Sequence, residues 1–163
     1  MGVLDSHQNI SRRLWLFGSV ALGSVLALTA RRQPSHAASV RSRIEQPDSA
    51  DPSSFMERAL VMKQLAAENG DQAYGAVIVR SGGIVGQAPS RVVINEDPTA
   101  HAEMEAIRDA ARRLRTRGLH GSVMYSSSPP CPMCEAAAYW AGIESLFHGP
   151  DIIERGAPQL RRC

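Results

Sequence analysis

The feature of this sequence that most constrains its fold is a pair of short motifs far apart in the chain. The first is Thr99-Ala-His101-Ala-Glu103, and the second is Pro129-Pro-Cys131-Pro-Met-Cys134. One imidazole and two thiolates are ligands that zinc prefers, and three protein ligands leave its fourth tetrahedral position open. The carboxylate of Glu103 can then move protons instead of binding metal. The pattern predicts a catalytic zinc site.

The three cysteines of the chain are Cys131, Cys134 and Cys163. A close Cys-x-x-Cys pair with a distant histidine indicates a metal site rather than a disulfide framework. A redox-active dithiol is the alternative interpretation of this pair, and the accompanying His-Ala-Glu motif favours the metal. We therefore expect His101, Cys131 and Cys134 to bind zinc, and we expect no role for Cys163.

The sequence pattern over residues 53–163 predicts one domain in which strands and helices alternate. Ser54 and Glu57 form a capping box that predicts the start of the first helix. Asp97 and Pro98 suit the N-cap and first positions of the helix that carries His101. Short runs rich in β-branched residues, bounded by turn residues, predict strands. The expected strands are residues 74–79, 84–87, 123–126 and 146–148, and the cysteine motif is expected to open a helix over 131–141.

Residues 1–37 have the features of an export signal. The stretch Ser11–Phe17 (SRRLWLF) resembles the twin-arginine motif, the uncharged run Leu14–Ala30 follows it, and small residues precede Ala38. We expect a twin-arginine-type signal peptide and a periplasmic protein, with a polar linker over 38–52. The alternative is an uncleaved membrane anchor, because a run of 17 residues is at the lower limit for spanning a bilayer.

The formal net charge of +2 is unevenly distributed. Four arginines and one aspartate lie in residues 1–37, so the rest of the chain carries a net charge of −1. A polyanion-binding protein should keep its basic charge after processing, which argues against a nucleic-acid substrate. The second half of the His101 helix carries Arg108, Arg112, Arg113, Arg115 and Arg117. We favour a solvated face over a phosphate-binding face for them, because the chain has 17 arginines and one lysine.

From Tyr74 to about Gly149 the chain resembles the cytidine deaminase-like superfamily. It is most similar to the branch of bacterial guanine deaminases and tRNA adenosine deaminases. The matching stretches are Tyr74–Val79 (YGAVIV), Asp97–Glu103 (DPTAHAE) and Pro130–Cys134 (PCPMC), with Tyr139–Ala141 (YWA) similar to guanine deaminases. The resemblance implies a three-layer α/β/α fold, with helices on both faces of a mixed sheet of about five strands. It also implies a homodimer with one zinc ion per subunit.

The resemblance implies a zinc-dependent hydrolase that deaminates a nucleobase or nucleoside and releases ammonia, with a guanine-like purine favoured. Glu103 would take a proton from water and return protons to the ring nitrogen and to the leaving amine. The same resemblance puts Ala102, Ser90 and Pro130 at the substrate, although the branch usually has asparagine in place of Ser90. No nucleic-acid partner is favoured.

Two alternatives stay open on the sequence alone. One is a tRNA or nucleic-acid adenosine deaminase, and the other is a catalytically degenerate exported relative that binds zinc. The second is kept because the chain after Gly149 has no clear counterpart of the acidic residue in the family's C-terminal lid. For the same reason the final strand or helices of the fold are expected to be missing or frayed.

Overall fold

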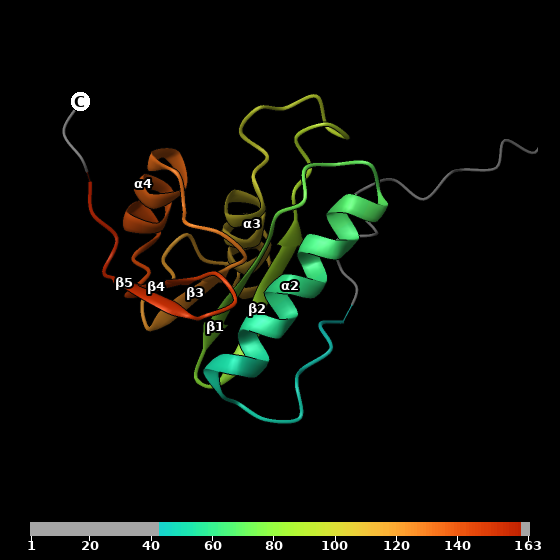
Figure 1. Cartoon of the computed structure of the whole chain (residues 1–163). Coiled ribbons are helices and arrows are strands. Elements are labelled where there is room, and N and C mark those ends of the chain that lie inside the picture. Colours follow the sequence, from blue (N-terminus) through green and yellow to red (C-terminus); the bar gives the residue numbers. More distant parts are fainter. Residues whose placement is uncertain (1–42, 161–163) are drawn as a thin grey trace, which may run out of the picture. The chain divides into compact units, whose positions relative to one another are not determined.

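The structure of the chain is a computed structural model that describes residues 43–160. The expected signal peptide, part of the expected linker and Cys163 lie outside the described residues, so those predictions are untested. The elements are α2 (Pro52–Glu68), β1 (Gly75–Arg80), β2 (Gly83–Pro89), α3 (Ala102–Leu114), β3 (Ser122–Ser126), α4 (Pro132–Ala141), β4 (Ser145–His148) and β5 (Ile153–Gly156) (Figure 1). No helix in this described part is both long enough and apolar enough to cross a bilayer.

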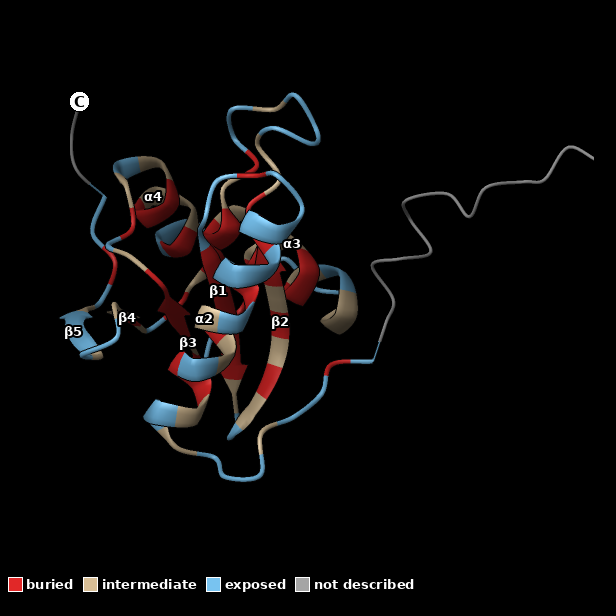
Figure 2. Ribbon diagram, turned by 45° about the vertical axis from the view of Figure 1, so that its right-hand side comes forward, coloured by how far each residue is buried: buried red, intermediate tan, exposed pale blue. Residues whose placement is uncertain are grey.

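The five strands form one mixed sheet in the order β2-β1-β3-β4-β5. The β3–β4 pair is parallel and the other three pairs are antiparallel. Side chains of β1 alternate between the two faces, so that Ala76 and Ile78 join the core under α3 and α4, while Val77 and Val79 join the core under α2. Figure 2 shows buried residues concentrated in the strands and on the inner sides of the helices. The predicted three-layer α/β/α fold is confirmed.

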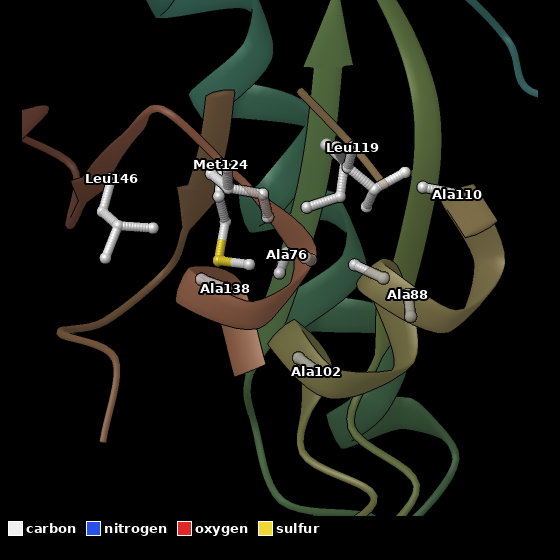
Figure 3. Packing of buried hydrophobic residues seen from close by; sticks show 12 residues of the cluster. Ala76, Ala88, Ala102, Ala110, Leu119, Met124, Ala138 and Leu146 are labelled. Atoms are coloured by element: carbon white, nitrogen blue, oxygen red, sulfur yellow. The ribbon is translucent and has the colours of Figure 1, made fainter. Parts of the chain in front are cut away.

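Small residues let the helices lie close to the sheet on both faces. A Cβ atom at Gly75 would come within 2.2 Å of the Lys63 backbone nitrogen in α2, and one at Gly86 would come within 2.6 Å of the Ala110 Cβ in α3. The core between α3, α4 and the sheet is rich in alanine, including Ala102, Ala110 and Ala138 (Figure 3). The slim inner sides of α3 and α4 therefore let the two helices, which carry the two motifs at their first turns, share one core and contact each other.

The free edge of β2 is covered by side chains from other parts of the chain. Gln46 donates to the carbonyl oxygen of Ile84 and accepts from its N–H, at 2.8 and 2.7 Å. The carboxylate of Asp109 in α3 accepts from the Gln87 N–H at 3.1 Å. Since unpaired edge groups invite pairing with another chain, these bonds protect the sheet. The described part of the expected linker has no helix or strand before Pro52, yet Gln46 ties it to the domain.

The structure differs from the sequence-based predictions at three elements. Helix α2 begins at Pro52, because Asp51 is its N-cap and accepts from the Ser54 N–H at 3.0 Å; the Ser54–Glu57 capping box therefore does not form. Strand β2 continues through Pro89 instead of ending before Ala88. The final strand, which was expected with the final helices to be missing or frayed, is present as β5 and pairs with β4; within residues 157–160 no helix follows it.

The helix that follows His101 also begins later than predicted. Helix α3 starts at Ala102 rather than at Pro98. Asp97 accepts bonds from the N–H and the hydroxyl of Thr99, at 2.8 and 2.7 Å, so its carboxylate closes a turn instead of capping a helix. The Arg91 N–H donates to the Ala100 carbonyl oxygen at 3.0 Å and closes the loop that leads to His101.

Candidate metal centre

In each motif, the first residue whose side chain could bind metal is the N-cap of a helix. His101 caps α3 with φ −61° and ψ 153°, and Cys131 caps α4 with φ −71° and ψ 166°. Neither side chain makes a capping hydrogen bond to its own helix, so each is free to point elsewhere. Cys134 lies in the first turn of α4 and is fully buried.

The structure brings the three predicted ligands together. The Cys131 and Cys134 sulfur atoms are 3.6 Å apart, and they lie 3.7 and 3.6 Å from the His101 Nδ1. Tetrahedral zinc with standard bond lengths separates two sulfurs by about 3.8 Å and sulfur from nitrogen by about 3.6 Å. The three ligand atoms therefore fit one zinc ion. Within residues 43–160 they are the one group of histidine, cysteine or acidic side chains arranged to hold a metal.

The protonation state of Cys134 links metal binding to pH. Burial raises the pKa of this thiol, and the charges of Glu103 and Cys131 raise it further. A thiol must lose its proton to become a metal ligand. A divalent cation entering this site must therefore expel a proton from Cys134, helped by the positive end of the α4 dipole.

Glu103 lies beside the three ligands without belonging to their group. It sits in the first turn of α3 and is 5% exposed. The hydroxyl of Ser126, at the end of β3, lies 3.1 Å from Glu103 Oε1 and 2.8 Å from the Ser128 carbonyl oxygen. This hydroxyl has one proton, so it can donate to one acceptor fully or be shared between the two. Sequence reasoning missed Ser126, although it is the last residue of the strand that leads to the cysteine motif.

The loop before His101 is anchored by the buried carboxylate of Asp71. That carboxylate accepts from the Ser90 hydroxyl and the Gln72 N–H at 2.8 Å, and from the Val93 and Ile94 N–H groups at 3.0 Å. Burial alone would raise the pKa of Asp71, but these four hydrogen bonds outweigh it and lower the pKa below its usual value. Ser90 has a structural role here as a result.

The predicted substrate-binding residues are all buried. Ala102 packs in the core, and Ser90 uses its hydroxyl proton on Asp71. Pro130 is also buried, immediately before Cys131. Their roles at a substrate stay predictions.

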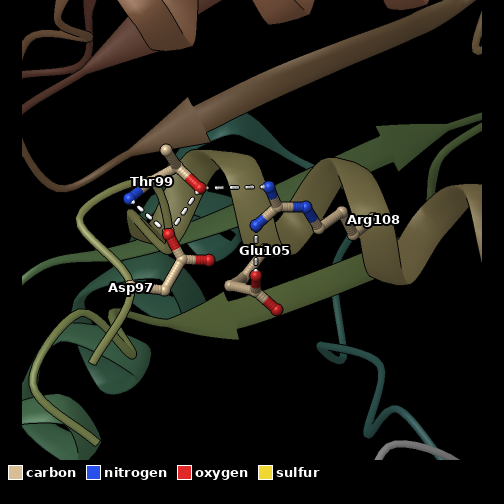
Figure 4. A network of polar contacts seen from close by, with 4 residues as sticks. All are labelled: Asp97, Thr99, Glu105 and Arg108. Carbon is tan, nitrogen blue, oxygen red and sulfur yellow. Dashed lines mark hydrogen bonds and ion pairs between the residues drawn. The ribbon is translucent and has the colours of Figure 1, made fainter. Parts of the chain in front are cut away.

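The arginines of α3 support the expectation of a solvated face. Arg108 pairs with Glu105 and also donates to Thr99 (Figure 4). Arg113 pairs with Asp109 at 2.8 Å. Arg112 in α3 is exposed, as are Arg115 and Arg117, which follow the end of the helix.

A groove of about 330 Å³ lies at the β2 edge, between α2 and α3. Its lining includes Arg58, Gln87 and Arg112, and none of the residues of the metal centre contributes to it. This groove is therefore not the cavity that a substrate of the metal centre would occupy.

Comparison with known protein families matches residues 49–149 to the cytidine and deoxycytidylate deaminase zinc-binding region. A guanine deaminase of Bacillus subtilis (strain 168) is 38% identical over 98 residues, which cover 60% of this chain and 63% of that protein. A tRNA-specific adenosine deaminase of Aquifex aeolicus is 42% identical over 93 residues, covering 57% of this chain and 62% of that protein. The chain thus spans a little under two thirds of the length of these two relatives.

Two solved structures have the same arrangement of elements. The crystal structure of a guanine deaminase from Bacillus subtilis superposes with a TM-score of 0.59 at 37% identity, and covers 61% of this chain and 64% of that one. A structure from a study of A-to-I editing by tRNA:A34 deaminases superposes with a TM-score of 0.56 at 38% identity, and covers 58% of this chain and 72% of that one.

Proposed function

Because the chain belongs to the family defined by the cytidine and deoxycytidylate deaminase zinc-binding region, we propose that it is a zinc-dependent hydrolytic deaminase. Its substrate is a free purine base or nucleoside with an exocyclic amino group, guanine-like by preference, and its products include ammonia. The observation that carries this proposal is the set of distances between His101, Cys131 and Cys134, which match a three-ligand zinc site with Glu103 beside it.

The metal ligands, Glu103 and Ser126 have different roles in the proposed reaction. His101, Cys131 and Cys134 would hold a zinc ion, which would act as a Lewis acid and lower the pKa of water toward neutrality. Glu103 accepts one proton from the attacking water and delivers it to the ring nitrogen. It then accepts the second proton from the hydroxyl formed on the ring carbon and delivers it to the amino group, which leaves as ammonia. The Ser126 hydroxyl lies 3.1 Å from one oxygen of Glu103 and would orient the carboxylate when it donates to that oxygen rather than to the Ser128 carbonyl. Proton transfer of this kind contributes about 10²- to 10⁴-fold to the rate.

A small substrate is favoured over nucleic acid by charge. The chain after residue 37 has a net charge of −1, and two arginines of α3 are neutralised by acids on the same helix. A tRNA-binding face would need unpaired cations along the phosphate backbone, and the exposed Arg112, Arg115 and Arg117 are the candidates for that role. The second candidate, a tRNA adenosine deaminase, is kept because the Aquifex aeolicus relative is 42% identical.

The test is ammonia release by the zinc-loaded full chain from a panel of free bases, nucleosides and a tRNA anticodon stem-loop. Turnover of guanine or a related small purine, abolished by Glu103→Gln, is the expected result. Turnover of the RNA alone would replace the first candidate by the second. Zinc binding without turnover of any substrate would instead indicate a degenerate zinc-binding relative.

We also propose export through a twin-arginine pathway and a homodimer. The export proposal rests on the motif at Arg12 and Arg13 and on the apolar run after it.

The dimer proposal is supported by Tyr139 and Trp140 on α4, which are 47% and 74% exposed and contact each other edge to face. Exposed aromatic side chains are common at protein interfaces.

A further inference from the structure

Glu135 is a buried acid that the proposed reaction does not use. It follows Cys134 directly in the first turn of α4 and is 5% exposed. Its backbone N–H donates to the Cys131 carbonyl oxygen at 2.9 Å. A buried carboxylate is costly unless polar or charged partners satisfy it, so its partners identify the part of the chain that stabilises this turn.

Both carboxylate oxygens of Glu135 are held by residues near the end of the described chain. The Arg155 Nη2 in β5 donates to Oε2 at 2.8 Å, and the Gln159 N–H donates to Oε1 at 3.3 Å. The side chain of Glu135 is 6% exposed and that of Arg155 is 29% exposed, so the pair is largely shielded from solvent. Figure 1 shows β5 and the segment after it beside α4. The residues on either side of Arg155, Glu154 and Gly156, pair with β4, and Arg155 is the extra residue of a β-bulge between them.

We propose that Glu135 and Arg155 form a clamp that holds the turn from Cys131 to Cys134 in its metal-binding geometry. Arg155 is then a positioning residue for the metal centre, far from the metal motifs in the sequence. The path is short: Arg155 holds the Glu135 side chain, and the Glu135 backbone is bonded to Cys131 and covalently linked to Cys134. The inference deepens the proposed function, because it rests on the same metal centre.

Charge gives a second reason for the clamp. Glu103 in α3 and Glu135 in α4 are both buried carboxylates in the first turns of the two helices that carry the metal ligands. Arg155 is the one basic side chain in the described part of the chain that pairs with Glu135. Without Arg155, the buried carboxylate would lose its charged partner, a change that is far more costly than the pair's net contribution. The carboxylate would then turn toward solvent and pull the cysteine turn with it.

The experiment measures Co²⁺ binding to the full chain, since thiolate-to-cobalt and d–d absorption report ligand geometry without requiring activity. Arg155→Gln is expected to weaken Co²⁺ binding about tenfold, in the range seen when groups that orient metal ligands are removed, and to shift the d–d bands. Arg155→Lys should restore most of the affinity. The matched control is Glu154→Gln in the same strand, whose side chain is exposed and bonds only to Ser145 at 3.3 Å; it should bind Co²⁺ like the parent.

Thermal unfolding of the metal-free variants separates positioning from stability. If Arg155→Gln lowers the metal-free Tm but leaves the cobalt spectrum and affinity unchanged well below that Tm, the pair is structural only and the inference is overturned. Glu135→Gln, which keeps the shape of the side chain, provides the same comparison if Arg155→Gln fails to fold. If the parent chain itself binds no Co²⁺, the proposed function fails along with the clamp. If the parent binds Co²⁺ and neither Arg155→Gln nor Glu135→Gln changes that binding, the clamp is refuted and the proposed function is not.

Discussion

The carboxylate of Asp71 offers the most direct test of how the loop before His101 is held. Asp71 is 8% exposed, and its two oxygens accept four hydrogen bonds. The Val93 and Ile94 N–H groups share Oδ2, while the Gln72 N–H and the Ser90 hydroxyl share Oδ1. Asp71→Asn keeps the shape of the side chain but replaces one oxygen by a donor.

The magnitude follows from which donors lose their acceptor. If the asparagine oxygen takes the Oδ2 position, Ser90 can rotate to accept, but the Gln72 N–H faces the new NH₂ group. If the oxygen takes the Oδ1 position, two backbone N–H groups lose their acceptor instead. Each buried donor left unsatisfied costs about 1–3 kcal/mol, and the remaining bonds lose their charge assistance. We therefore expect Asp71→Asn to lower the free energy of unfolding by about 2–4 kcal/mol. This is a large fraction of the free energy of unfolding of a typical domain.

Urea unfolding measured as a function of pH provides the assay. The pKa of Asp71 is lowered in the folded state, so its contribution is present above the unfolded-state pKa, about 3.9, and is lost as the pH falls through the lower folded-state value. The difference between parent and Asp71→Asn should thus be largest near neutral pH and shrink below about pH 4. Asp97→Asn is the control, since that half-buried carboxylate accepts only from Thr99 among the residues described. The Thr99 hydrogen bonds also lower the pKa of Asp97, so this variant should show the same direction of pH dependence with a smaller difference. A difference below about 0.5 kcal/mol at neutral pH, or one that does not shrink in acid, would refute the reasoning.

Three further predictions concern the metal centre. Glu103→Gln is expected to retain zinc and to lose about 10²- to 10⁴-fold in kcat, measured by ammonia release and by metal analysis; loss of zinc as well would show that Glu103 has a structural or ligand role. Ser126→Ala should lower kcat about tenfold with little change in KM, because Glu103 loses the donor that orients it; an unchanged kcat would show that the Ser128 contact is the one that matters. Zinc binding should release protons and weaken as the pH falls from about 8 to 6, because burial raises the pKa of the Cys134 thiol; a pH-independent affinity in competition with a chelator would contradict this.

The sequence was sufficient for the features that depend on neighbouring residues. The strand at Gly75–Arg80, for example, was predicted to within one residue, because a β-branched run between turn residues has few other conformations. The start of α3 was missed, because Asp97 and Pro98 satisfy a helix-start pattern and a turn pattern equally well, and the choice depends on the distant Asp71 that holds the loop.

Contacts between residues far apart in the chain could not be predicted from the sequence, for the same reason. Nothing near Ser126 indicates that its hydroxyl lies beside Glu103, 23 residues earlier, and nothing near Glu135 indicates Arg155, 20 residues later. These contacts follow from the order of strands in the sheet, which places the end of β3 next to α3 and places β5 beside α4. A single sequence contains no local pattern for such an order.

The position of His101 explains how two residues of one short motif can serve one metal ion in different ways. In an ideal helix, residues two apart point about 200° away from each other, so His101 and Glu103 could not both face the metal from within α3. His101 instead precedes the helix in an extended conformation, while Glu103 lies in the first turn and is held by Ser126. Cys131 repeats the arrangement at α4, with Cys134 in the turn that follows. Because the imidazole and the first thiol both come from cap positions, the ion would sit beyond the ends of both helices. The carboxylate of Glu103 is thereby left at the side of the ion, as a proton carrier beside a three-ligand zinc requires.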